Sequence, residues 1–126
     1  MRNGWRVAVL AWLVCVGCGQ GGGRLVVEPI PDGVRSNFDL DGFYRQHVMV
    51  GPLAVVGSSA VRDESLLEAA WIVRRMLAGR DDILQAMADR RVRLAVMAWN
   101  EFTTDIPEHA ELEPAVFWDR RARGLG

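Results

Sequence analysis

Residues 63–78, DESLLEAAWIVRRMLA, form the stretch of sequence that decides the fold. Their apolar side chains recur at spacings of three and four residues, which places them on one face of an α-helix. This apolar face consists of Leu66, Ala70, Val73 and Leu77, with Ala69, Ile72 and Met76 beside it. Asp63 and Glu64 favour a helix start here, and Gly79 is a typical stop. Because such a face must be buried, the sequence predicts a long helix packed on a sheet.

A shorter helix and two strands are expected around the long helix. Asp81 begins a second apolar pattern that ends near Asp89 and predicts a short helix. Residues 52–57 are rich in valine and bounded by glycines, and residues 92–97 alternate, so both segments predict strands. The order predicts an α+β or α/β fold, in which the long and the short helix pack on a small sheet that one or two strands would leave incomplete.

The flanking segments carry weaker signals. Residues 25–27 are a candidate strand, but prolines and an Asp-Gly pair predict little regular structure before Phe38. Residues 39–48 favour a short helix because an aspartate at their start can cap it. Residues 100–109 read as a long polar loop, and residues 115–121 as a helical turn after a proline.

The first 17 residues have the layout of a lipoprotein-type signal peptide. Arg2 and Arg6 form a basic start, and residues 7–16 are all apolar. This run is shorter than the roughly 20 apolar residues that a membrane-spanning helix needs. The following Cys15-Val16-Gly17-Cys18 resembles the bacterial lipoprotein box with Cys18 as the lipidated residue, although Cys15 stands where leucine is usual.

Lipidation of Cys18 would export the chain and anchor it in a membrane of the cell envelope, on the periplasmic or outer-membrane side. Residues 18–37 would then form a glycine-rich tether and an irregular lead-in to a folded part at 38–126. The alternatives are simple secretion, with cleavage near residues 17–23, and a short buried N-terminal helix.

Composition and charge exclude several classes of protein. Half of the residues are apolar and a quarter are charged, which argues against a disordered tail. All 15 basic residues are arginine, and cleavage before Cys18 would leave a net charge of −3. We therefore expect no nucleic-acid partner, because that function needs a strongly basic face. A mature chain with one cysteine would also form no internal disulfide.

The residues form no complete catalytic, cofactor-binding or metal-binding motif. A zinc peptidase helix needs two histidines one turn apart with a glutamate, and the only histidines are His47 and His109. We expect His47 at the surface or at a helix cap, and His109 in a solvated acidic loop. Ser58 does not lie in a G-x-S-x-G elbow, and we expect it to shape the turn before the long helix.

Aromatic side chains are numerous for a short chain. Two interpretations remain open, burial in the core and exposure for binding a partner, and burial is favoured because large aromatic residues are mostly buried. The set consists of Trp71, Trp99, Phe102, Phe117 and Trp118.

Six segments together resemble the N-terminal part of a family of uncharacterised bacterial exported proteins that look like zincin-type metallopeptidases. The resemblance covers residues 38–126. Its segments are FYRQH (43–47), VVGS (55–58), RMLAGR (75–80), RLAVMA (93–98), EFTTDIPEH (101–109) and WDRRARGLG (118–126).

In that family the metal-binding H-E-F-x-H helix follows the segment that matches Gly124–Gly126. The resemblance therefore implies a truncated N-terminal part of a zincin-like domain, inactive alone, with zinc expected only in full-length relatives. A peptide or protein substrate is implied only where the missing C-terminal part is present. The resemblance also places two loops at a cleft that later sequence would complete. The residues concerned are Thr103, Thr104, Asp105, Glu108, His109, Arg120 and Arg121.

The alternative is a complete small cell-envelope lipoprotein that acts as a binding or structural module. Reading the DNA beyond the codon for Gly126 separates the two hypotheses, because only the first requires an open frame that encodes H-E-F-x-H.

The lipoprotein hypothesis predicts that cells expressing the chain attach a fatty-acid analogue to it at Cys18. A Cys18→Ser variant should lose the label, because the thiol is the atom that carries the lipid. The measurement is in-gel detection of the analogue on the purified chain. Label retained by the variant would refute this site.

Overall fold

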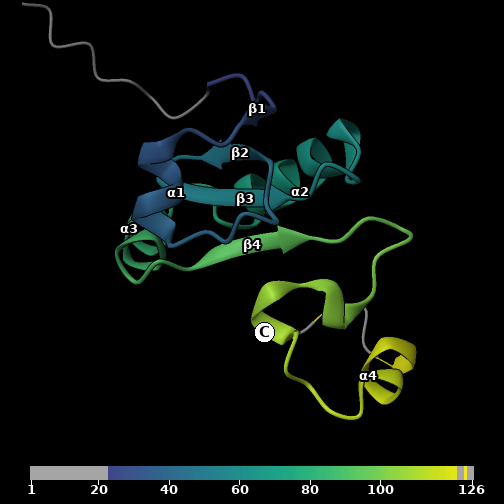
Figure 1. Cartoon of the computed structure of the whole chain (residues 1–126). Coiled ribbons are helices and arrows are strands. Elements are labelled where there is room, and N and C mark those ends of the chain that lie inside the picture. The colour runs from purple at the N-terminus through teal and green to yellow at the C-terminus, as the bar shows by residue number, and fades with distance from the viewer. Residues whose placement is uncertain (1–22, 122–123, 125–126) are drawn as a thin grey trace, which may run out of the picture.

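In the computed structural model, which describes residues 23–121 and 124, four strands form one mixed sheet in the order β1-β2-β3-β4 (Figure 1). β1, β2 and β3 pair antiparallel in succession, whereas β4 pairs parallel to β3. The strands are β1 Glu28–Pro29, β2 Gln46–Val50, β3 Leu53–Gly57 and β4 Arg93–Val96. The helices are α1 Asp32–Phe38, α2 Asp63–Met76, α3 Asp81–Asp89 and α4 Ala115–Arg121, and the 3-10 turns are η1 Thr103–Asp105 and η2 Pro107–His109. The expected α+β fold is confirmed.

Strand β3 lies at the centre of the fold and is buried along its whole length. Leu53 and Val55 point to one face of the sheet, where α2 packs, and Ala54 and Val56 point to the other. A strand buried on both faces reads as a continuous apolar run, which is why residues 52–57 were recognisable in the sequence. A two-residue turn joins it to β2, with Gly51 at a φ of +57°, a conformation that glycine adopts at little cost.

Helix α2 covers one face of the sheet. Leu66 and Ala70 are buried against valines of β2 and β3, and Leu84 of α3 joins the same cluster. The long helix and the short helix thus both exist within a residue or two of their predicted bounds. Ile72 and Met76 do not widen the buried stripe, because Met76 is 76% exposed and Ile72 is also exposed. The small sheet covers only a narrow stripe of the helix.

Helix α1 and the turn after it cover the opposite face of the sheet, with Phe38, Leu40 and Tyr44 buried against Ala54 and Val56. The prediction of little regular structure before Phe38 was therefore wrong. Pro31 takes the extended N-cap conformation and the helix begins directly after it. The helix ends in a Schellman motif in which the Leu40 N–H donates to the Arg35 carbonyl at 3.0 Å.

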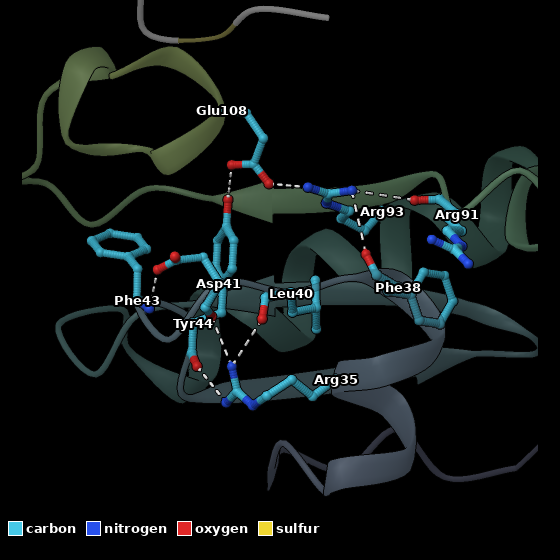
Figure 2. A network of polar contacts seen from close by, with 9 residues as sticks. All are labelled: Arg35, Phe38, Leu40, Asp41, Phe43, Tyr44, Arg91, Arg93 and Glu108. Atoms are coloured by element: carbon cyan, nitrogen blue, oxygen red, sulfur yellow. Dashed lines mark hydrogen bonds and ion pairs between the residues drawn. The ribbon is translucent and has the colours of Figure 1, made fainter. Parts of the chain in front are cut away.

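The predicted helix over residues 39–48 is also wrong. Asp39 has a left-handed φ of 52°, and the Asp41 carboxylate accepts the N–H of Phe43 at 2.7 Å, so this stretch turns instead. The Arg35 guanidinium holds the turn by donating to the carbonyls of Leu40, Asp41 and Tyr44 (Figure 2). The chain then enters β2, because pairing with β3 outweighs a local helix preference. The remaining predicted strand, at residues 25–27, is displaced to Glu28–Pro29.

The close contact at Gly57 generates a prediction about stability. A Cβ at this position would lie 3.0 Å from Val61 Cγ2 and 3.3 Å from Leu66 Cδ2, side chains that are buried in the core. Gly57→Ala should lower the free energy of unfolding by about 1–3 kcal/mol, because overpacking forces the neighbours to move. Urea unfolding followed by circular dichroism measures this change. Gly33→Ala is the matched control, since a Cβ there meets nothing within 4 Å in a helix, and it should stabilise the chain.

Candidate functional site

A groove of about 530 Å³ runs along the outer edge of β4. Along this strand, Ala95 packs against the buried cluster that contains Tyr44, and Val96 packs against the buried cluster under α2. Because side chains alternate along a strand, Arg93 points to the same face as Ala95 and Leu94 to the opposite face. Side chains from both faces line the groove, and it therefore follows the edge of the strand. The lining consists of residues 90–95, Met97, Thr103, Ile106, Glu108, His109 and Gly124.

The Glu108 carboxylate joins η2 to the sheet beside this groove (Figure 2). Its Oε2 accepts the hydroxyl of Tyr44 at 2.5 Å, and its Oε1 accepts the guanidinium of Arg93. The same guanidinium donates to the Phe38 carbonyl at 3.4 Å, at the end of α1. A charged hydrogen-bond pair of this kind fixes orientation as well as adding energy.

The network shifts the titration of two of its members. Partial burial alone would raise the pKa of Glu108, but the hydrogen bonds from Tyr44 and Arg93 outweigh it and lower that pKa below its usual value. Burial and the neighbouring Glu108 carboxylate raise the pKa of Tyr44. At neutral pH Glu108 is therefore an ionised acceptor and Tyr44 a protonated donor. With both oxygens engaged, Glu108 is suited to anchoring the turn rather than to moving protons.

A second carboxylate ties the loop after β4 to the loop after β3. Glu101 accepts the hydroxyl of Ser58 and the N–H of Ala98 at 2.6 Å. Ser58 also accepts the N–H of Ala60 at 3.0 Å, so it shapes the turn before α2 as the sequence predicts. Glu101 and Glu108 together fix residues 98–109, which we call the anchored segment.

The structure divides the seven residues expected at a cleft. Thr103, Glu108 and His109 line the groove, and Asp105 accepts the N–H of Phe102 at 2.8 Å within its own turn. Thr104 donates its N–H and its hydroxyl to Asp119, both at 3.0 Å, and so joins η1 to α4. Neither of the two α4 arginines in this set lines the groove: Arg120 is exposed, and the Arg121 guanidinium stacks 4.8 Å from the Phe117 ring.

Sequence reasoning missed several residues of the site. Tyr44 lies in the segment that was assigned to a helix, and nothing in the sequence connects it to Glu108, 64 positions away. The sequence indicated for Arg93 only that it is a polar residue in an alternating strand, and gave no partner for it. Arg90 and Arg91 line the groove because they lie in the short connection between α3 and β4. The predicted bounds of the short helix and of the following strand already placed them in this connection.

Two further expectations about individual side chains are corrected. His47 is not at the surface or at a cap: it is 3% exposed on β2, with Nδ1 3.1 Å from the Glu28 carbonyl oxygen. The aromatic residues are not mainly core residues either. Trp99 is 86% exposed, and Trp71, Phe102 and Phe117 are also exposed. They lie on the outer side of α2, in the anchored segment and on α4, where the small sheet does not reach.

Cys15 and Cys18 lie outside the described residues, so the lipidation site stays a prediction. Within the described part of the chain, no three histidine, cysteine or acidic side chains gather closely enough to hold a metal ion. A search of the same residues for a helix long and apolar enough to cross a membrane finds none. Comparison of the chain with protein-family models, with curated proteins and with solved structures finds no match.

The Glu108 network generates a prediction about pH. Because folding lowers the pKa of Glu108, its stabilising effect is present above the unfolded value of about 4.3 and is lost as the pH falls through the lower folded value. Glu108→Gln should therefore destabilise the chain at pH 7, and the loss should be smaller at pH 3, below the unfolded value. Unfolding by urea at both pH values measures the difference. An equal loss at both would contradict the ionic role of Glu108, and Glu111→Gln, an exposed change in the same loop, is the control.

Proposed function

We propose that the chain is the framework part of an exported, lipid-anchored protein of the zincin-like metallopeptidase type, and that it is inactive alone. The observation that carries the proposal is the anchored segment held beside an open groove by Glu101 and Glu108. A peptidase needs such a rigid wall next to its cleft, because catalytic geometry depends on supporting residues that do not move.

The role of the framework is positional. Thr103 and His109 face the groove, while Thr104 and Asp119 join the anchored segment to α4. The resemblance places the metal-binding helix in sequence that follows these elements, and zinc belongs to that part. This chain would supply the sheet, the groove wall and, through Cys18, the attachment to a lipid membrane.

A second candidate is a complete small lipoprotein that binds a partner. The exposed apolar side chains of the C-terminal half favour it, since Trp99, Phe102, Val116 and Phe117 are all open to solvent. Exposed apolar side chains of this size are what an interaction site requires. The same residues would be covered in the framework proposal, where further chain packs on them.

The first experiment reads the gene beyond the codon for Gly126. The framework proposal predicts an open frame that encodes H-E-F-x-H. In the protein translated from that frame, His109→Ala should lower kcat/KM for a fluorogenic peptide about tenfold, corresponding to a loss of about 1.4 kcal/mol in transition-state stabilisation. The melting temperature should stay unchanged, because the His109 side chain lies at the groove and not in either core cluster.

Glu111→Ala is the matched control, because this residue is exposed in the same loop and does not line the groove. A stop codon followed by unrelated sequence would remove the framework proposal and favour the binding module. Equal losses of activity and melting temperature for His109→Ala would assign that residue to the fold rather than to the cleft.

A further inference from the structure

We propose that the groove along β4 binds an extended, acidic peptide segment that pairs with the outer edge of this strand. The inference rests on the proposed function in its choice of site, because it names the ligand class of the same groove, but binding needs no metal ion and no catalytic residue and is measured on this chain alone. It rests on three features of the described residues: an open strand edge, positive charge without a counterpart, and an arginine in a backbone conformation that favours glycine.

The first feature is the edge itself. The sheet order ends at β4, and no other strand among residues 23–121 pairs with its outer side. An edge strand presents backbone N–H and C=O groups that can pair with an added strand. The four residues of β4 span about 13 Å at about 3.3 Å per residue, so they match a ligand of about four extended residues. The groove follows this edge, and Leu94, Met97 and Ile106 supply apolar contacts for alternate ligand side chains.

The second feature is charge. Arg90 and Arg91 are exposed at one end of the groove, and neither takes part in an ion pair with another described residue. Glu108 is the one acidic side chain in the groove lining, and Tyr44 and Arg93 already engage it. The groove therefore offers two arginines to a ligand and no free carboxylate, which selects an acidic occupant.

The third feature is the backbone of Arg91. Helix α3 ends in a Schellman motif, with the Arg91 N–H bonded to the Ala88 carbonyl at 2.8 Å and the Val92 N–H to the Met87 carbonyl at 2.9 Å. This motif puts Arg91 at a φ of 58°, where glycine is usual and a side chain is strained. Arg91 thus lines the groove although its backbone conformation favours glycine, and strain of this kind concentrates at binding sites.

An acidic peptide fits these features better than a second copy of the chain does. The β4 edge of a second copy would bring the same two unpaired arginines, and its groove carboxylate, Glu108, would again be engaged by Tyr44 and Arg93. Pairing of two such edges would place positive charge near positive charge, with no unpaired carboxylate between them.

The test measures fluorescence anisotropy of a labelled eight-residue peptide that alternates valine and glutamate, titrated with the purified chain. Two further peptides serve as probes: one carries glutamine in place of glutamate, and one carries N-methyl groups on alternate backbone amides. The first tests charge and the second tests strand pairing. We expect the acidic peptide to bind, and both altered peptides to bind at least fivefold more weakly.

Variants of the chain locate the site. Arg91→Gly should raise the melting temperature, because it relieves the positive φ, and should weaken binding about two- to fivefold, because an exposed ion pair is lost. Arg90→Gln should weaken binding by a similar factor. Arg45→Gln is the matched control, since Arg45 is exposed, does not line the groove and should leave binding unchanged.

Opposite changes in stability and affinity for Arg91→Gly cannot arise from partial unfolding, so this variant separates a binding role from a structural one. Equal binding of the acidic and the glutamine peptide, or full binding of the N-methylated peptide, would overturn the proposal. So would a loss in Arg45→Gln equal to that in Arg90→Gln. A dimer that dissociates on Arg91→Gly would instead assign the edge to a second copy, and arginine-dependent binding of an oligonucleotide would assign it to nucleic acid.

Discussion

Burial of β3 on both faces is the constraint on which the rest of this structure depends. A strand without an exposed face needs two covers, and the chain supplies α2 on one side and α1 with Tyr44 on the other. Helix α3 closes the end of the sheet, with Leu84 in one cluster and Ala88 in the other. The small sheet can therefore support two thin cores, and large side chains beyond its reach, such as Met76 and Trp99, stay exposed.

Polar contacts rather than apolar packing place the anchored segment. Its apolar contribution to the cores is small, and its position depends on the carboxylates of Glu101 and Glu108, which reach back to Ser58, Tyr44 and Arg93. Hydrogen bonds of this kind specify one geometry even where they add little net stability. The groove beside β4 has a definite shape for that reason, and one of the carboxylates that hold its wall titrates with a lowered pKa, whereas its arginines stay charged.

The sequence predicted the elements whose signal is local. The long helix, the short helix, β3 and β4 all carry an apolar periodicity that matches their burial, and the α+β class follows from their order. Helix α1 and strand β2 were missed, because a Schellman turn and hairpin pairing decide them and neither appears in a periodicity. The site was predictable only in part: the loop that holds Glu108 was identified, but its partner Tyr44 comes from a distant segment that folding alone brings near.

The two kinds of strand pairing in the sheet differ in how they can come apart. β1, β2 and β3 are neighbours in the chain and form a meander, whereas β4 joins β3 only after the chain has passed through α2 and α3. A contact between distant segments forms late and opens early relative to a hairpin. Separation of β4 would carry the anchored segment away with it and dismantle the groove, while the hairpin and its valine core stayed closed. We therefore expect the site and the core of this molecule to open as different cooperative units, a difference that hydrogen exchange can detect.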